Sequence, residues 1–123
     1  MINNAGYGVV GPLETVSVQE AQQEFDVNVW GVVRVLQAVL PHMRKAKKGH
    51  VINLSSTSGA LFTCLMACFI LLQLNSLFSS GLRGLPGYEF YTGSKFALEG
   101  ITDAMRYSLA PFNIFVTNVN PGK

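Results

Sequence analysis

The segment HVINLS (His50–Ser55) is a short apolar stretch that lies between two long helical patterns. Its valine, isoleucine and leucine residues are typical of a buried strand. A second stretch of this kind, Asn113–Val119, follows the second helical pattern. Short apolar strands that alternate with helices indicate an α/β fold with a parallel sheet. We also expect Met1–Ile2 to be the end of a strand, which leads into a polar, glycine-rich turn from Asn3 to Gly11.

The first helical pattern runs from about Val18 to Lys47, and Gly49 is the expected stop signal. We expect Gly31 and Pro41 to disturb this helix without ending it. Its apolar residues recur with a period of 3.6 and form one stripe. The stripe consists of Phe25, Val29, Val32, Val33, Leu36, Val39, Leu40 and Met43.

The second helical pattern runs from about Tyr88 to Leu109, and Pro111 prevents it from continuing. A chain of 123 residues is long enough for one domain but not for two. The predicted fold class is therefore α/β: part of a doubly wound parallel sheet with two long helices. The residues expected to face inward from the second helix are Leu98, Ile101, Ala104, Met105 and Leu109.

Charge and cysteine usage exclude several classes of function. The net charge is +2 and only 13% of residues are charged, so we expect no nucleic-acid surface. The basic run Arg44–Lys48 is interpreted as the solvated last turn of a helix, where the dipole favours cations. Cys64 and Cys68 have neither the usual zinc spacing nor that of a redox pair, so we predict no metal site. Reduced, buried thiols favour an intracellular, cytoplasmic location.

Residues Ala60–Gly81 interrupt the alternation of helices and strands with a hydrophobic segment. No charged residue occurs between Val51 and Leu82. The continuous apolar part, Ala60–Leu72, is shorter than the ~20 residues that a membrane-spanning helix needs. We therefore expect an additional helix here, buried or partly exposed, in preference to a membrane span.

Tyr91 and Lys95 are the residues most suggestive of chemistry. Four residues apart on a helix, they project from one face. An ammonium beside a phenol stabilises the phenolate, which makes an acid/base able to exchange a proton with an alcohol or ketone. Taken singly, Tyr91 is more often a half-buried aromatic, Lys95 a solvated helix residue and Ser56 a capping serine. Asn28 is unusual, because a mid-helix asparagine competes for backbone hydrogen bonds.

Five motifs, in order, resemble the short-chain dehydrogenase/reductase family. They are the N-N-A-G turn at Asn3–Gly6, the helical asparagine motif at Phe25–Gly31, the strand and serine motif at Ile52–Gly59, the Y-x-x-x-K motif with its continuation at Tyr91–Gly100, and the N-P-G turn at Asn120–Gly122. The chain is identified as a member of this family, of its classical type. The sequence around residues 84–86 and 111–115 is similar to that of the steroid and retinol dehydrogenases of this family.

The resemblance implies a Rossmann-like fold and an NAD(P)-dependent oxidoreductase that interconverts a small-molecule alcohol and ketone. Tyr91 would exchange the substrate proton, Lys95 would hold the nicotinamide ribose, Ser56 would bond the substrate oxygen, and Asn28 would fix a water. NADP is favoured over NAD, and intact relatives are expected to be homo-oligomers through the two long helices. The implied cofactor-binding residues are Asn4, Ala5, Gly6, Tyr91, Lys95, Pro121 and Gly122.

The sequence departs from the family in lacking its glycine-rich phosphate loop. We therefore interpret residues 1–123 as an incomplete domain that starts near the family's fourth strand and stops before its substrate-covering segment. Dinucleotides bind where the strand order reverses, and that crevice needs strands not found here. We expect the 123 residues alone to bind cofactor poorly and to be inactive. Two alternatives are a non-catalytic fragment that pairs through its helices and a membrane-associated protein that uses residues 60–78.

The second departure is the distance of 35 residues from Ser56 to Tyr91. Removing Ala60–Gly81, which is 22 residues, leaves 13 and restores a sequence ordinary for the family. We therefore interpret Ala60–Gly81 as an insertion, with the hypothesis that it is a translated intron. Comparison of transcript and genomic sequence would decide this. The alternative is a genuine hydrophobic lip on the substrate entrance.

Overall fold

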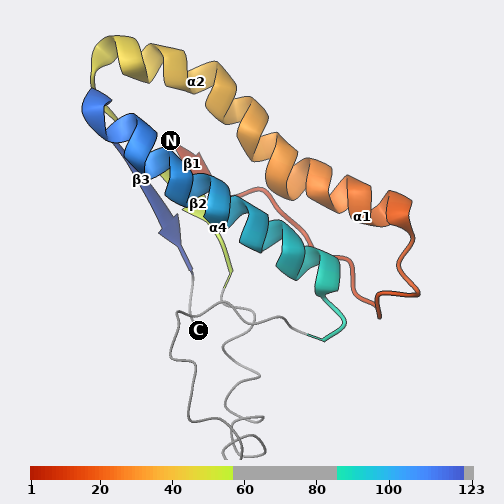
Figure 1. Cartoon of the computed structure of the whole chain (residues 1–123). Coiled ribbons are helices and arrows are strands. Elements are labelled where there is room, and N and C mark those ends of the chain that lie inside the picture. Colours follow the sequence, from red (N-terminus) through yellow and green to blue (C-terminus); the bar gives the residue numbers. More distant parts are fainter. Residues whose placement is uncertain (57–85, 121–123) are drawn as a thin grey trace, which may run out of the picture.

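The structure, a computed structural model, describes residues 1–56 and 86–120 (Figure 1). The predicted insertion Ala60–Gly81 and the predicted cofactor residues Pro121 and Gly122 lie outside this described part. In chain order the elements are β1 (Ile2–Asn3), α1 (Val18–Phe25), the π-helical segment η1 (Asp26–Gly31), α2 (Val32–Ala46), β2 (Gly49–Leu54), α4 (Glu89–Leu109), the 3₁₀ turn η2 (Ala110–Phe112) and β3 (Ile114–Val119).

The three strands form one parallel sheet in the order β1-β2-β3. Ile2 lies opposite Ile52, and β2 pairs with β3 from Gly49 opposite Ile114 to Leu54 opposite Val119. The predicted α/β class with a parallel sheet is therefore confirmed. The first strand begins at Ile2 rather than at Met1, whose ammonium instead donates to the His50 carbonyl at 2.8 Å.

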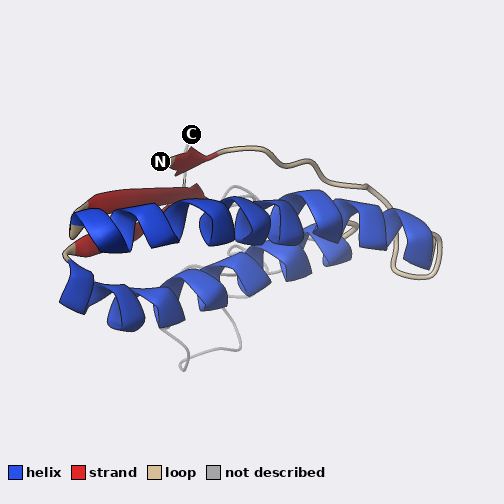
Figure 2. Ribbon diagram, turned by 90° about the horizontal axis from the view of Figure 1, so that it is seen from above, coloured by secondary structure: helices blue, strands red, loops and turns tan. Residues whose placement is uncertain are grey.

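The helices cover one side of the sheet, as Figure 2 shows. The alternation of a strand places every second residue on that side, and these residues are buried. The apolar core consists of Val32, Leu36, Val51, Leu98, Leu109, Ile114 and Val116. On the opposite side of the sheet, Ile2 is 65% exposed and Phe115 is 63% exposed.

The predicted helix from about Val18 to Lys47 is confirmed in its extent, and the expected disturbance at Gly31 takes the form of η1, a π-helical segment that widens the turn and ends at that residue. Buried side chains recur there at every fourth position: Glu24, Asn28, Val32 and Leu36. With 3.6 residues per turn, such a series drifts off the buried face of an α-helix. The wider π turn compensates for this drift. The helix begins with a capping box in which Ser17 and Glu20 bond each other's backbone N–H groups.

The predicted end of the helix near Lys47 is confirmed. Lys47 itself, with φ 49°, is the left-handed C-cap, so the helix stops before it reaches Gly49. Gly49 is needed for a different reason, since a methyl group there would lie 2.6 Å from Met43 Sδ. Pro41 lies inside α2 without ending it, as predicted. Of the helices within 1–56 and 86–120, none has both the length and the apolar character that crossing a bilayer requires.

A buried chain of polar groups joins the sheet to α4. Asn3 Nδ2 donates to Asn53 Oδ1 at 2.7 Å, and Asn53 Nδ2 donates to Thr102 Oγ1 at 2.8 Å. The Thr102 hydroxyl in turn donates to the Leu98 carbonyl at 2.7 Å. These partners satisfy polar groups that would otherwise be costly to bury. This series of hydrogen bonds fixes the rotation of α4 over β2. That rotation in turn determines where Tyr91 and Lys95 lie.

Candidate active site

Asn28 lies at the centre of the candidate site and is fully buried in η1. Its Nδ2 donates to the Tyr7 carbonyl at 2.8 Å and to the Ser94 hydroxyl at 3.0 Å. Its Oδ1 accepts the Tyr7 N–H at 3.1 Å. One side chain therefore joins the N-terminal loop, the π-helical segment and α4. Both amide donors are occupied, so a water held by this side chain could only donate to Oδ1.

Lys95 is buried under the end of β2, with 7% of the residue exposed. Its Nζ donates to the Leu54 carbonyl at 3.1 Å and lies 5.5 Å from the centroid of the Tyr91 ring. The helical spacing predicted from the sequence thus brings the ammonium and the phenol ring together. An ammonium over an aromatic ring is attracted by the quadrupole of the ring.

The glycine-rich loop after β1 approaches these side chains closely. A methyl group at Gly6 would lie 3.1 Å from Asn28 Oδ1 and 3.4 Å from Lys95 Nζ. At Gly8, a methyl group would lie 3.1 Å from Cδ2 of the Tyr91 ring. The absence of a side chain at both positions lets the loop backbone pack directly against Asn28, Lys95 and Tyr91.

The structure thus brings together Gly6, Asn28, Tyr91 and Lys95 from four separate parts of the sequence. Ser56 is half-buried and lies two residues beyond Leu54, whose carbonyl binds Lys95. The predicted approach of the Ser56 hydroxyl to the Tyr91 ring stays a prediction. So do the roles of the predicted cofactor residues Asn4 and Ala5, which lie on the exposed part of the loop.

Two buried residues of this region were missed by sequence reasoning. Ser94 is fully buried, accepts from Asn28, and donates to the Tyr91 carbonyl at 2.7 Å. The feature of the sequence that could have indicated Ser94 is its position beside Lys95 within the Y-x-x-x-K motif. Glu24 is also fully buried, and its Oε2 accepts the Val9 N–H at 2.8 Å. The feature of the sequence that could have indicated Glu24 is the presence of an acidic residue one turn before Asn28, on the side of the helix that carries the buried residues.

Burial raises the pKa of Glu24 above its ordinary value, because the charged carboxylate is poorly solvated there. The Val9 N–H bond and the positive charge of Lys95 oppose this rise. Glu24 Oε1 has no hydrogen-bond partner within residues 1–56 and 86–120.

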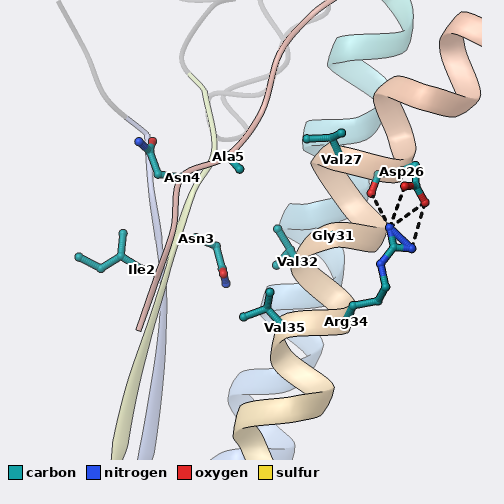
Figure 3. A pocket seen from close by; sticks show the side chains of 10 residues that line it. All are labelled: Ile2, Asn3, Asn4, Ala5, Asp26, Val27, Gly31, Val32, Arg34 and Val35. Carbon is teal, nitrogen blue, oxygen red and sulfur yellow. Dashed lines mark hydrogen bonds and ion pairs between the residues drawn. The ribbon is translucent and has the colours of Figure 1, made fainter.

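A pocket of about 380 Å³ lies between β1 with its following turn and the helix formed by η1 and α2 (Figure 3). Such a volume is within the range of small-molecule sites. Arg34 lies at the helix side and forms an ion pair with Asp26 at 2.8 Å. The lining residues are Ile2, Asn3, Asn4, Ala5, Asp26, Val27, Gly31, Val32, Arg34 and Val35. Of the predicted cofactor residues, Asn4 and Ala5 line this pocket.

Comparison with known proteins agrees with the motifs. The family model for short chain dehydrogenase matches residues 1–68 and 75–123. Retinol dehydrogenase 8 of Homo sapiens is 38% identical over 99% of this chain and 32% of its own length. The 3-ketodihydrosphingosine reductase of Bacteroides thetaiotaomicron is also 38% identical, over 99% of this chain and 37% of its own. The chain thus spans about a third of the length of these curated relatives.

Solved structures show the same relationship. A short-chain dehydrogenase from Streptomyces avermitilis superposes with a TM-score of 0.77 and 30% identity, over 99% of this chain and 37% of its own. NAD⁺-bound xylitol dehydrogenase gives a TM-score of 0.76 and 28% identity, over 98% of this chain and 38% of its own. The parallel sheet, the predicted motifs and the family match agree: this chain belongs to the short-chain dehydrogenase family.

Proposed function

We propose that this chain supplies the proton-transferring part of an NAD(P)-dependent oxidoreductase that interconverts an alcohol and a ketone. The observation that carries the proposal is the Lys95 ammonium, held by the Leu54 carbonyl, 5.5 Å from the centroid of the Tyr91 ring. A cation held beside a phenol stabilises the negative charge that develops on the phenolic oxygen during proton transfer. Tyr91 is thereby suited to take a proton from an alcohol, or to return one to a ketone.

In the direction of alcohol oxidation, the proposed reaction removes two hydrogens from one substrate carbon and its oxygen. The Tyr91 phenolate takes the hydroxyl proton, while the Ser56 hydroxyl bonds the substrate oxygen as its charge changes. A nicotinamide cofactor held by Lys95 and the turn after β1 would supply the acceptor for the hydride from the substrate carbon. The C–H and O–H bonds break and the C=O bond forms. In ketone reduction, Tyr91 donates the proton instead.

The turn after β1 fits a dinucleotide in two respects. Gly6 lets the backbone approach Lys95 and Asn28, so a ribose hydroxyl near Lys95 would not meet a side chain at that position. The pocket lined by Asn4 and Ala5 also has apolar walls, formed by residues such as Val27 and Val35, that suit a flat heterocycle. Solved relatives hold NAD⁺ in one case and NADP in another. We propose NADP as the first cofactor to test.

Substrate size is a further part of the proposal. The curated relatives are named for retinol, for 3-ketodihydrosphingosine and for 17β-hydroxysteroids. These compounds are bulky and lipophilic. We therefore propose a lipophilic alcohol or ketone as the substrate of this protein.

The 123 residues alone are proposed to be inactive. In doubly wound folds the dinucleotide lies across a crevice with strands on both sides. Within the described residues, β1 has only two residues and pairs on one side, with β2. The purified chain should therefore show no hydride transfer from NADH or NADPH, as followed by absorbance. Turnover by the purified chain would contradict this part of the proposal.

The chemistry itself is tested in a chimera. Residues 1–123 replace the matched part of the Bacteroides thetaiotaomicron 3-ketodihydrosphingosine reductase, in one version intact and in another without 60–81. In the active version, Tyr91→Phe should lower kcat by about 10²- to 10⁴-fold, as expected for loss of a general acid. Tyr107→Phe, on the same helix but 79% exposed, is the matched control and should have no effect. Full turnover by Tyr91→Phe, or no turnover by a folded chimera that binds cofactor, would exclude the proposal.

Association through the helices is proposed as well. Large side chains on the helices remain exposed: Trp30 is 54% and Phe96 is 43% accessible. Exposed aromatic residues are enriched at protein interfaces. We expect a homo-oligomer by light scattering, and expect Trp30→Glu with Phe96→Glu to convert it to a monomer. An unchanged mass for the double variant would contradict this interface.

A further inference from the structure

We propose that Glu24 is a positioning residue for the Tyr91–Lys95 pair: its buried carboxyl clamps the loop that packs against Lys95 and the Tyr91 ring. The catalytic consequence of this inference rests on the proposed function. The structural part of the inference, however, rests on contacts within the chain and is tested without measuring enzyme activity.

The first step is the clamp on the loop. Glu24 Oε2 accepts the Val9 N–H at 2.8 Å, and Asn28 bonds both backbone groups of Tyr7. Glu24 and Asn28 are four residues apart and both fully buried. These two side chains, about one helical turn apart, thus hold the loop at Val9 and at Tyr7, on either side of Gly8. The Gly11 N–H completes the attachment by donating to the Gly87 carbonyl at 2.9 Å.

The second step leads from the loop to the phenol. Gly8 lies between the two clamped residues, and its backbone packs against the Tyr91 ring. A methyl group at Gly8 would lie 3.1 Å from Tyr91 Cδ2 and 3.4 Å from Tyr88 Cδ1. Because the ring and the loop are in direct contact, whatever holds Val9 in place also limits where the Tyr91 ring can lie.

The third step is the charge. Glu24 is 0% exposed, and its Oε1 has no hydrogen-bond partner in the described part of the chain. An uncompensated carboxyl in the interior is costly, so its position calls for a reason. The titratable groups on the loop, on η1 and at the start of α4, which pack against α1, are Tyr7, Asp26, Tyr88, Glu89, Tyr91 and Lys95. Among these, the positive charge of Lys95 opposes the rise in the pKa of Glu24.

The electrostatic part is tested by carboxyl ¹³C NMR titration of the whole 123-residue chain. Replacing Lys95 by Met removes the positive charge, so the Glu24 midpoint should move to higher pH. Glu20 serves as the control in the same spectra, since it is exposed at the start of the same helix and bonded to Ser17. Its midpoint should not move. An unchanged Glu24 midpoint in Lys95→Met would overturn the electrostatic part.

The clamp is tested by amide hydrogen exchange. Glu24→Ala removes the acceptor for the Val9 N–H, and exchange at Val9 should speed up by about tenfold. Glu24→Gln keeps an acceptor oxygen and should restore slow exchange and the Tyr91 ring chemical shifts. Glu14→Ala, exposed on the loop, is the matched control. Equal Val9 exchange in Glu24→Ala and the parent chain would overturn the clamp. If Glu24→Ala does not fold, the Lys95→Met titration still decides, because it leaves Glu24 in place.

The catalytic consequence is read in the active chimera. Glu24→Gln should shift the pH profile of kcat while leaving KM unchanged, because it removes the charge but keeps the clamp. Glu24→Ala should lower kcat further. A pH profile identical to the parent in both variants would overturn a role in the reaction. Absence of turnover in the chimera would count against the proposed function alone, since the two NMR experiments do not depend on it.

Discussion

The Asn28 side-chain amide donates a hydrogen bond of 3.0 Å to the Ser94 hydroxyl, 66 residues along the chain. The same hydroxyl donates to the Tyr91 carbonyl one turn earlier in α4. The π-helical segment and the Tyr91–Lys95 turn are thereby joined through a single buried hydroxyl. The position of Tyr91 thus depends on Asn28, although the two residues lie on different helices.

Asn28→Ala should destabilise the chain by about 1–3 kcal/mol, because it leaves buried groups of Tyr7 and Ser94 without partners. Urea unfolding followed by circular dichroism measures the change. Asn4→Ala, on the exposed part of the loop, is the control and should alter the free energy of unfolding by less than about 0.5 kcal/mol. Equal stabilities for the two variants would mean that the Asn28 bonds contribute nothing.

Gly8→Ala should destabilise the fold and move the Tyr91 ring, since the added methyl group would lie 3.1 Å from it. Overpacking of this kind costs about 1–3 kcal/mol. Ring chemical shifts and the urea midpoint report the two effects. Gly100→Ala is the opposite case, because a methyl group there would meet no atom within 4 Å among the described residues, apart from the neighbouring backbone of its own helix. It should stabilise α4 by up to about 1 kcal/mol. A neutral Gly8→Ala would show that the loop does not press on the ring.

Glu20 and Glu24, one turn apart on α1, should give opposite pH dependences of stability. Hydrogen bonds from the Ser17 hydroxyl and backbone hold the pKa of Glu20 below 4.5, so its contribution is present above that value and is lost as pH falls. Burial raises the pKa of Glu24 above 4.5, so its contribution is present below that value and is lost as pH rises.

Unfolding free energies of Glu20→Gln and Glu24→Gln, measured on both sides of pH 4.5, test these signs. Relative to the parent, Glu20→Gln should lose stability as pH rises, and Glu24→Gln should gain it. Parallel curves for the two variants would refute the assignment. The measurement also separates the exposed carboxylate from the buried one without any assay of activity.

Lys47→Gly should stabilise the chain by about 0.5–1 kcal/mol, because Lys47 occupies the left-handed region that glycine adopts without strain. Lys48→Gly, at the next position, lacks this benefit and serves as the control. Thermal unfolding followed by circular dichroism compares the two. A stabilisation of equal size at Lys48 would show that the gain does not come from the C-cap.

The elements of the fold could be predicted from local sequence, because their signals are local. The apolar runs at β2 and β3 and the stop at Pro111 each depend on a few neighbouring residues. The spacing of Tyr91 and Lys95 sufficed to place both on one face of a helix. The resemblance to the family then indicated which motifs lie in one site. No single stretch of the sequence contains that information.

The contacts that could not be predicted all depend on distant partners. Glu24 is fully buried, and its Oε2 accepts the N–H of Val9, 15 residues earlier. Asn28 bonds Tyr7 and Ser94, which lie 21 and 66 residues away. The disturbance expected at Gly31 lies at the end of η1, but the sequence alone did not indicate that it would be a π turn.

The π-helical turn holds one residue more than an α-helical turn would, because its hydrogen bonds join residues five apart instead of four. Losing one codon between Asp26 and Gly31 would therefore leave an ordinary α-helical turn, with Val32 and Leu36 still facing the core. The same loss between Val32 and Leu36 would turn Leu36 out of the core, since each residue of an α-helix rotates it by about 100°. We expect natural variants to differ in residue number within η1 more readily than within α2.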